Sequence, residues 1–478
     1  MSDLIIRKLS LSLLAAGVLS ACSLAPKYQR PEAPVAAAFP SAEAAAAETA
    51  RGAQDIGWRE FFPDQRLQAL ITSALANNRD LRMTALRIEE ARALYNIQRA
   101  DLLPNLNAAA GGSRARVPAE LSPTRTGVTT TSYQVGLNLA AFELDFFGRV
   151  RSLNEAALSQ YLATEEARRA AQISIVAEVA KAYLSERAFA EQQELAQRTF
   201  ESRETGYRLA KQRFDVGASS ALDLRQNETL VQSARASLAI ATRQRAQAIN
   251  ALTLLTGTPP ADLPQPQPLS TQNIVTDIPA GLPSDLLVRR PDIRAAERRL
   301  MASNANIGAA RAAFFPRISL TAGVGTASSS LSGLFDAGSS TWSFAPQLLL
   351  PIFDAGRNSA NLDVAQVRKN LAVADYEKTI QVAFREVADA LVARATLDEQ
   401  LDAQRAVQDA QAERLKLAEL RYQNGVASSL DVLDAQRELF TAQQQFVQAR
   451  LLRLTNAIDL YRSLGGGLNE TTVAAAAR

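Results

Sequence analysis

The stretch Leu209–Asp223, LAKQRFDVGASSALD, occurs again 208 residues later as Leu417–Asp431, LAELRYQNGVASSLD. Both copies keep an arginine, an aromatic residue, a glycine, a serine and a leucine–aspartate pair at the same spacing. A match of this length at one offset indicates that part of the chain is duplicated. The central glycine suits a tight turn between two helices, because glycine adopts positive φ without strain.

The duplication extends along most of the chain. The offset of 208 also relates Gly148 to Gly356, whereas an offset of 212 relates Pro104 to Pro316, so four extra residues (212 − 208) lie between Pro104 and Gly148. The sequence predicts two large repeats rather than a short-period solenoid. The expected segments are a signal peptide at 1–21, an extended arm at 22–63, repeats at 64–257 and 282–465, a proline-rich linker at 258–281 and a tail at 466–478.

Each repeat contains two strand-like runs. Residues 132–139 alternate strictly between apolar and polar side chains, and residues 318–325 do so in the second repeat. This period of two indicates strands with one apolar and one polar face. Turn-rich runs lie beside them, at Val117–Thr131 and Ser328–Thr341. We therefore expect two hairpins and four strands.

Long helical patterns flank each hairpin. One precedes it, at about 64–102 and 284–313, and a proline-free one follows, near 148–215 and 356–424. Almost 70 helical residues span roughly 100 Å. The helices that return after the tight turns carry apolar and small residues at alternating spacings of three and four, in one register in both copies. This pattern is typical of a coiled-coil seam.

The residue types limit the chemistry of the chain. It has no histidine, and its only cysteine is Cys22. This excludes histidine-based catalysis, histidine or cysteine metal sites and an internal disulfide. Adjacent acidic residues such as Glu89 and Glu90 point about 100° apart on a helix and do not converge. We expect no enzyme activity, metal or cofactor, and the mixed charges, with a formal net charge of +3, imply no nucleic-acid partner.

The N-terminus is typical of an exported lipoprotein. Arg7 and Lys8 precede a short apolar run, and Leu-Ser-Ala-Cys ends at Cys22. This order predicts a cleaved secretory signal and an N-terminal lipid on Cys22, the spacing that lipidation needs. The alternative is a chance cysteine at the end of an ordinary signal. Ser23 rather than aspartate after the cysteine favours sorting to the outer membrane.

A lipoprotein with four long alternating strands can cross a bilayer only as a closed barrel. Four strands cannot close one, because the smallest membrane barrels have about eight strands. Two copies would supply eight strands and three would supply twelve, and geometry alone leaves both open. Aromatic residues near the strand ends, such as Phe315 and Trp342, suit interfacial belts, although the core of a soluble sandwich would also explain them.

Several motifs in fixed order are more specific than any one pattern. They are CSLAPKYQRP at Cys22–Pro31, GWREFF at Gly57–Phe62, FELDFFGR at Phe142–Arg149, GLPSDLL at Gly281–Leu287, RRPDI at Arg289–Ile293, IGAARAAFFP at Ile307–Pro316 and the repeated turn motif. Together they resemble the TolC-like outer-membrane factors of tripartite efflux pumps, in particular the OprM-type lipoproteins. The resemblance covers nearly the whole chain after Cys22.

The resemblance implies an α+β membrane protein: a trimer with a twelve-stranded outer-membrane barrel, a helical periplasmic tunnel and an equatorial belt built from the terminal segments and the linker. It implies a channel that passes drugs and other small amphipathic compounds out of a Gram-negative cell. The implied partners are outer-membrane lipid, a periplasmic adaptor and a proton-driven inner-membrane pump of the resistance-nodulation-division class. A duct for protein secretion or metal ions, or a periplasmic coiled-coil scaffold without a channel, is the alternative.

By alignment with OprM-type tips, the resemblance implies a periplasmic gate at Leu430 and Asp434, an apolar ring above an acidic ring, with Asp431 beside them. Asp431 could instead only complement the helix dipole. The two turns are expected to meet the adaptor and also to serve as simple turns, with serines at 219–220 and 428–429 as natural N-caps. The docking residues expected there are Gly217, Ser220, Asp223, Gly425 and Ser428.

Overall fold

The computed structural model describes residues 24–36, 38–39, 52–121, 125–259, 263–275, 278 and 283–472. Cys22 and the expected signal peptide lie outside them. The described residues form two compact units. The sheet unit contains the described residues within 24–32, 87–165 and 295–377, and the tip unit contains those within 33–86, 166–294 and 378–472.

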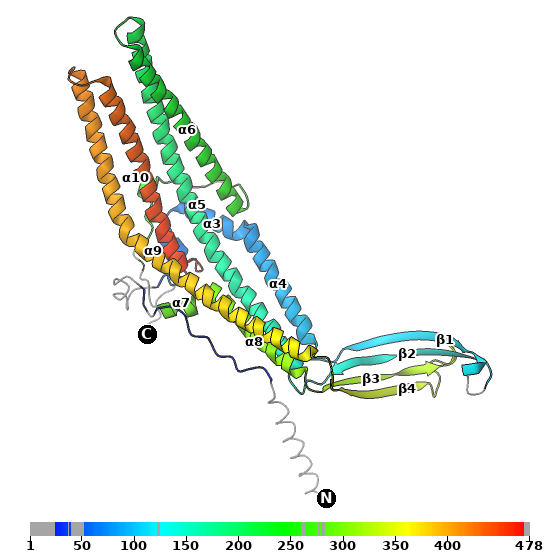
Figure 1. Cartoon of the computed structure of the whole chain (residues 1–478). Coiled ribbons are helices and arrows are strands. Elements are labelled where there is room, and N and C mark those ends of the chain that lie inside the picture. Colours follow the sequence, from blue (N-terminus) through cyan, green and yellow to red (C-terminus); the bar gives the residue numbers. More distant parts are fainter. Residues whose placement is uncertain are drawn as a thin grey trace. The chain divides into compact units, whose positions relative to one another are not determined.

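The sheet unit contains one antiparallel sheet in the order β1-β2-β3-β4 (Figure 1). Its strands are β1 Leu106–Val117, β2 Val128–Glu143, β3 Arg317–Ser328 and β4 Ser340–Leu349. The expected two hairpins and four strands are confirmed. β2 begins inside the run that was expected to be a turn, because the β-branched residues Val128–Thr131 continue the ladder opposite β1.

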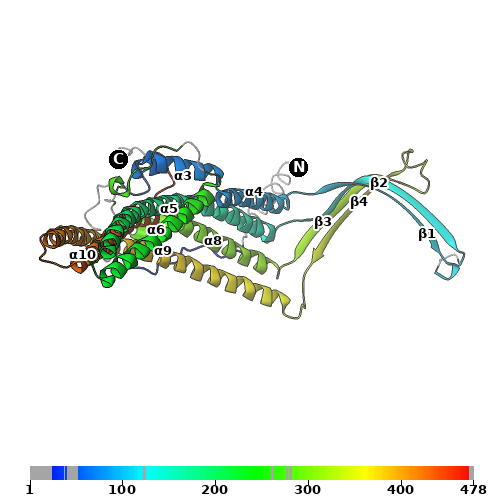
Figure 2. The same cartoon turned by 90° about the horizontal axis from the view of Figure 1, so that it is seen from above.

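The apolar sides of the two hairpins lie on the same face of the sheet, since Leu137 pairs with Val324 and Leu139 with Ala322. The β2–β3 register shifts between Leu139 and Phe142, where Ala141 has a φ of 46°. This is a β-bulge, with one extra residue on β2. Every residue of β4, and all but the last of β1, is exposed. The described residues provide no second sheet layer, so the soluble sandwich is not observed; Figure 2 shows the four strands curving together.

Two of the expected helices are each split by a single residue. The first stretch forms α3 Gln65–Asn77 and α4 Arg79–Ala100, and the second forms α7 Pro283–Arg289 and α8 Pro291–Ala312. Arg290 breaks the second stretch because a residue before proline disfavours helical φ and ψ. Asn78 breaks the first: its backbone is extended, and its side chain accepts a hydrogen bond from the N–H of Leu81.

The long helices appear where the sequence predicts them. They are α5 Arg149–Asp215 and α9 Arg357–Gln423, each of 67 residues, with the returning helices α6 Ala221–Thr256 and α10 Ser429–Ser463. Each expected seam position on α6 and α10 is buried or half-buried, for example Val231, Ala234, Ala442 and Phe446. The coiled-coil seam is therefore confirmed in both copies.

The core of the tip unit joins the chain's terminal segments and linker. The short helix α2 Trp58–Phe61 is buried, and Phe61 stacks on Tyr461 of α10 with ring centroids 3.9 Å apart. The linker, which includes the 3-10 turn Leu269–Thr271, is tied to this core because Gln272 donates to the buried carboxylate of Asp64 at 2.6 Å. Another short 3-10 turn, Ala119–Leu121, lies between β1 and β2.

Small residues let the helices of the sheet unit approach closely. Ala156 of α5 and Ala302 and Ala305 of α8 form a buried cluster. A Cβ at Gly308 would lie 2.6 Å from the Ser152 hydroxyl and 2.7 Å from Ala25, so only glycine fits there. Within the described ranges, no helix is long and apolar enough to cross a membrane.

Candidate functional site

The turn between α5 and α6 (the first tip) and the turn between α9 and α10 (the second tip) have the same backbone conformation. Gly217 and Gly425 have φ values of 74° and 72°, in the left-handed region that the tight turn was expected to need. No atom lies within 4 Å of a Cβ built on either glycine. The requirement for glycine is therefore conformational rather than steric.

Each returning helix begins with a capping box. The Ser220 hydroxyl accepts from the N–H of Asp223, and the Asp223 carboxylate accepts from the N–H of Ser220; Ser428 and Asp431 repeat this arrangement. The hydrogen bonds from Ser220 lower the pKa of Asp223. Of the four serines expected as possible caps, Ser220 and Ser428 are the ones used. Asp431 thus stabilises the first turn of α10.

The two tips also contact each other. Arg213 donates from Nη1 to the hydroxyl of Tyr422 at 2.9 Å, and Ser429 donates to Asp223 Oδ1 at 3.4 Å. Arg213 and Tyr422 lie just before the turns of their respective copies. The contacts therefore join the end of α5 to the end of α9, and the start of α6 to the start of α10.

The proposed gate residues differ in their surroundings. Leu430 is 54% exposed, and its counterpart Leu222 is similarly exposed. Asp434 is held by two arginines: Arg414 of α9 donates to Oδ2 at 2.9 Å, and Arg437 of α10 donates to Oδ1. Neither arginine was predicted from the sequence to be part of the site.

The internal repeat distinguishes Arg414 and Arg437 in the sequence, because neither has a charged counterpart in the first copy. Under the offset of 208, the counterparts of Asp434, Arg414 and Arg437 are Gln226, Gly206 and Thr229. All three charged residues are therefore specific to the second copy. Because they also contact one another, the charged cluster Arg414–Asp434–Arg437 distinguishes the second tip from the first.

A third cation, Arg203, lies near this cluster. Arg203 of α5 is buried, and its Nε and Nη2 groups have no hydrogen-bond partner in the described structure. Its Nη1 donates weakly to the carbonyl of Leu230 at 3.4 Å, and its guanidinium lies 5.7 Å from the ring of Phe440. Burial, and secondarily the charge of Arg437, lower the pKa of Arg203. The buried positive charge of Arg203 is therefore balanced by few favourable contacts.

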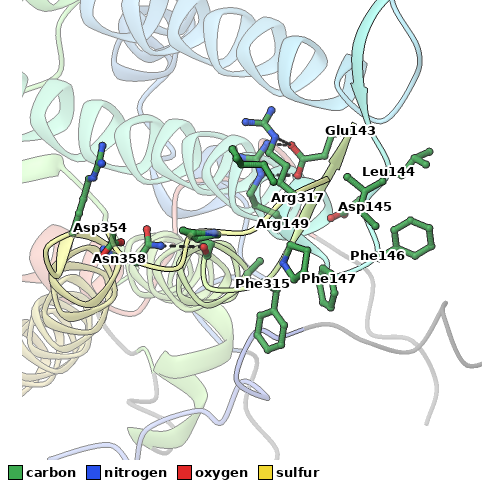
Figure 3. A pocket seen from close by; sticks show the side chains of 17 residues that line it. Glu143, Leu144, Asp145, Phe146, Phe147, Arg149, Phe315, Arg317, Asp354 and Asn358 are labelled. Carbon is green, nitrogen blue, oxygen red and sulfur yellow. Dashed lines mark hydrogen bonds and ion pairs between the residues drawn. The ribbon is translucent and has the colours of Figure 1, made fainter. Parts of the chain in front are cut away.

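A separate cavity of about 440 Å³ lies at the base of the strands, within the sheet unit (Figure 3). Glu143 accepts two hydrogen bonds from Arg149, at 2.7 and 2.8 Å, and pairs with Arg317 at 2.6 Å. Phe147 and Phe315 stack beside them with centroids 4.8 Å apart. These contacts tie the β2–α5 connection to β3. Among the described residues, no group of three or more acidic, histidine or cysteine side chains is arranged to hold a metal ion.

The segment after Cys22 lies along α8. Arg311 donates to the carbonyl of Leu24 at 3.2 Å and Asn304 to that of Pro26 at 2.7 Å, while Arg30 makes a two-point contact with Glu297 at 2.7 and 2.9 Å. Leu24 is therefore beside the end of α8 that leads into β3. The lipid on Cys22 remains a prediction.

The sequence profile of the outer membrane efflux protein family matches residues 70–258 and again residues 282–466. The two matches begin 212 residues apart (282 − 70) and end 208 apart (466 − 258), which are the two offsets of the internal duplication.

Relatives of similar length match throughout. Outer membrane protein OprJ of Pseudomonas aeruginosa is 52% identical over 460 residues, and the toluene efflux pump outer membrane protein TtgF of Pseudomonas putida is 52% identical over 469 residues; each match covers 96% of both chains. The structure is similar to the open state of the MtrE outer membrane channel of Neisseria gonorrhoeae, with 45% identity, a TM-score of 0.86 and coverage of 95% of this chain and 100% of that one. The CmeC outer membrane channel of Campylobacter jejuni, 29% identical, has a TM-score of 0.87 with coverage of 94% and 96%.

Proposed function

This chain belongs to the outer membrane efflux protein family, and from that premise we propose that three copies form the exit duct of a tripartite efflux pump. The duct would consist of a twelve-stranded barrel in the outer membrane and a helical tunnel in the periplasm. It performs no chemistry; it supplies a water-filled path and a gate.

This proposal rests on the unpaired edges of the four-stranded sheet. Its edge strands β1 and β4 have no further strand beside them in the described chain, and nearly all of their residues are exposed. In hydrocarbon, each unpaired backbone N–H or C=O group costs several kcal/mol, so the edges must be paired. Two copies would give eight strands and an interior filled by side chains, whereas three give twelve and leave a passage.

Native mass measurement and single-channel recording of the purified protein test the assembly. We expect the mass of three chains and discrete current steps in a planar bilayer. A monomer that gives no steps would refute the duct and favour a periplasmic scaffold.

The gate is proposed to lie at Leu430 and Asp434, with Asp431 holding the start of the helix that carries them. Leu430 and Asp434 are one turn apart and therefore on one face of α10. The charged cluster Arg414–Asp434–Arg437 supports this, because it surrounds Asp434 in the second tip and its counterparts in the first tip, Gly206, Gln226 and Thr229, are uncharged. Rings of apolar or charged side chains are a common way to constrict a pore.

Alanine at both gate positions, Leu430→Ala with Asp434→Ala, should raise single-channel conductance. The matched control is Leu222→Ala with Gln226→Ala at the equivalent positions of the first tip, which should leave conductance nearly unchanged. Equal changes in conductance in the two variants, or no change in either, would refute the assignment of the gate to the second tip.

The tips are proposed to dock a periplasmic adaptor, with Gly217, Ser220, Asp223, Gly425 and Ser428 setting the shape of the surface. Two exposed apolar residues, Val216 and Val426, lie beside the turn glycines. Glutamate at both valines should abolish co-purification with the adaptor while the trimer remains intact. Unchanged co-purification would place the docking surface elsewhere.

The lipid anchor is proposed at Cys22. The path of residues 24–30 along α8 supports it, because this path leads the chain to the end of α8 from which β3 starts. Mass spectrometry of the mature N-terminal peptide should show an acylated cysteine. A free thiol in that peptide would refute the anchor.

The cargo is proposed to be drugs, solvents and other small amphipathic compounds, delivered by a proton-driven pump of the resistance-nodulation-division class. The relative TtgF is named for toluene efflux. Deletion of the gene should lower the minimum inhibitory concentration of several unrelated drugs. Unchanged drug tolerance together with loss of a secreted protein or of metal tolerance would favour the alternative cargoes.

A further inference from the structure

The sheet ends in two edge strands, and the proposed trimer would join β4 of one copy to β1 of the next. On the basis of that proposed assembly, we infer the register of this joint. Each residue of β4 faces the residue of β1 in the next copy for which the two residue numbers add up to 458. Ala345 of one copy then lies opposite Ser113 of the next copy. The occupant of each sheet edge is thus a second copy of this chain, held in one defined alignment.

The internal joint between β2 and β3 provides the template, because the duplication makes β2 the counterpart of β4 and β3 the counterpart of β1. The offset from β1 to β3 is 212. Ala108 of β1 therefore corresponds to Leu320 of β3 (108 + 212). Ala108 pairs with Leu137, and Leu320 pairs with Pro346. The offset from this part of β2 to β4 is therefore 209 (346 − 137).

The bulge in β2 explains why this offset is one larger than 208. It inserts one residue between Leu139 and Phe142, so 209 applies before the bulge and 208 after it. Before the bulge, Gly136 pairs with Gly325, which transforms to residues 345 (136 + 209) and 113 (325 − 212). After the bulge, Phe142 pairs with Leu320, which transforms to residues 350 (142 + 208) and 108 (320 − 212). Both pairs sum to 458, so the two sides of the bulge give one continuous register.

The side chains support this alignment independently of the repeat. It places Trp342 opposite Arg116 and Phe344 opposite Arg114 of the next copy, on one face of the sheet. Trp342 and Phe344 are 80% and 62% exposed in the single chain. Arginine beside an aromatic ring across two strands is a favourable pair. A slip of two residues in either direction keeps only one of the two pairs: Trp342 with Arg114, or Phe344 with Arg116.

The register also pairs nearly the whole of β4. Residues 341–349 face residues 117–109, so nine of its ten positions have a partner inside β1. Pairing of this length satisfies the edge groups of nearly all of β4 and of residues 109–117 of β1. It also fixes which side chains face lipid, because a slip of one residue would turn every side chain of the neighbouring hairpin to the other face.

Cysteine cross-linking of the full-length protein tests the register. Ala345→Cys is combined in one chain with Gly111→Cys, Ser113→Cys or Ala115→Cys; these three positions share one face of β1. A disulfide within one chain is excluded, because β1 and β4 are separated by two strands, about 14 Å, and a disulfide needs Cα atoms within about 7 Å. The unsubstituted protein, whose only cysteine is Cys22, is the control for background cross-linking.

The combination with Ser113→Cys should give several-fold more reductant-sensitive dimer and trimer on denaturing gels than either displaced combination. Strongest cross-linking at position 111 or 115 would overturn the register but leave the trimer in place. No cross-linking in any variant of trimeric mass would overturn the β4–β1 joint. A monomeric mass would instead refute the proposed assembly.

Discussion

The first and second tips have the same backbone but different surroundings. Both use a glycine with positive φ and a serine–aspartate capping box. The second tip alone carries the charged cluster Arg414–Asp434–Arg437, whose counterparts are Gly206, Gln226 and Thr229. Duplication has therefore kept the residues that make the turn, while the residues behind the turn have diverged.

The repeated helix–turn–helix motif therefore contains two kinds of residue: those that form the turn and those on the helix surfaces behind it. Turn residues are constrained by φ and by capping, which both copies need equally. Charged side chains on the helix surfaces are free to differ, and here they differ in three positions that contact one another. A gate confined to one copy would therefore depend on the residues in which the two tips differ, and not on the turn that they have in common.

The largest effect on stability is expected from Arg203, which has no charged counterpart in the second copy. Arg203→Met removes a buried cation whose Nε and Nη2 groups lack partners, and it should raise the free energy of unfolding by about 1–3 kcal/mol. Thermal unfolding in detergent followed by circular dichroism measures it. The matched control is Gln411→Met at the equivalent position, which should change stability little. A destabilised Arg203→Met protein would show that the guanidinium is satisfied.

A smaller effect, equal in both tips, is expected at the turn glycines. Gly217→Ala and Gly425→Ala should each cost about 1–2 kcal/mol, because a Cβ disfavours the left-handed conformation. Gly206→Ala is the control, since Gly206 is inside α5 and alanine there should stabilise by about 0.5–1 kcal/mol. Hydrogen exchange of the tip amides would report each change. Clearly unequal costs at the two turns would contradict the shared backbone role.

The smallest effect is expected from the first capping box at acidic pH. Hydrogen bonds from Ser220 lower the pKa of Asp223 in the folded state below its ordinary value of 3.8. The cap therefore stabilises α6 fully above that ordinary value and is lost as the pH falls through the lower folded pKa. Exchange protection of the first turn of α6, corrected for intrinsic rates, should fall in this range. Asp223→Asn should abolish this pH dependence, and its persistence would assign it to another group.

Local patterns predicted the elements well. The period of two and the proline-free runs identified the strands and the long helices, because each depends on residues close together in sequence. Element ends were less accurate: β2 begins earlier than expected, and Arg290 and Asn78 divide stretches that were expected to be continuous. A backbone break at one residue changes the average pattern of a long run very little, so periodicity does not detect it. The break at Arg290 is instead indicated by Pro291, because the residue before a proline disfavours helical φ and ψ.

The site was predicted less completely. The turn glycines and the capping serines follow from residues within a few positions of each other. The partners of Asp434 differ in this respect. Arg437 is three residues away on the same helix, whereas Arg414 is 20 residues away on another helix and reaches Asp434 only after α9 and α10 pack together. The isolated position of Arg203 likewise depends on α5, α6 and α10 together.

By itself, the sequence determined the duplication, the four strands, the two long helices and the turn that ends each of them, because these depend on local periodicity and on glycine and serine at fixed spacing. Only the tertiary structure decided that β2 pairs with β3 through a bulge, that Glu143 joins Arg149 to Arg317, and that Arg414 of α9 pairs with Asp434 of α10. These features depend on the packing of residues distant in sequence, where many pairings satisfy the same local pattern and the close approach of particular side chains selects one.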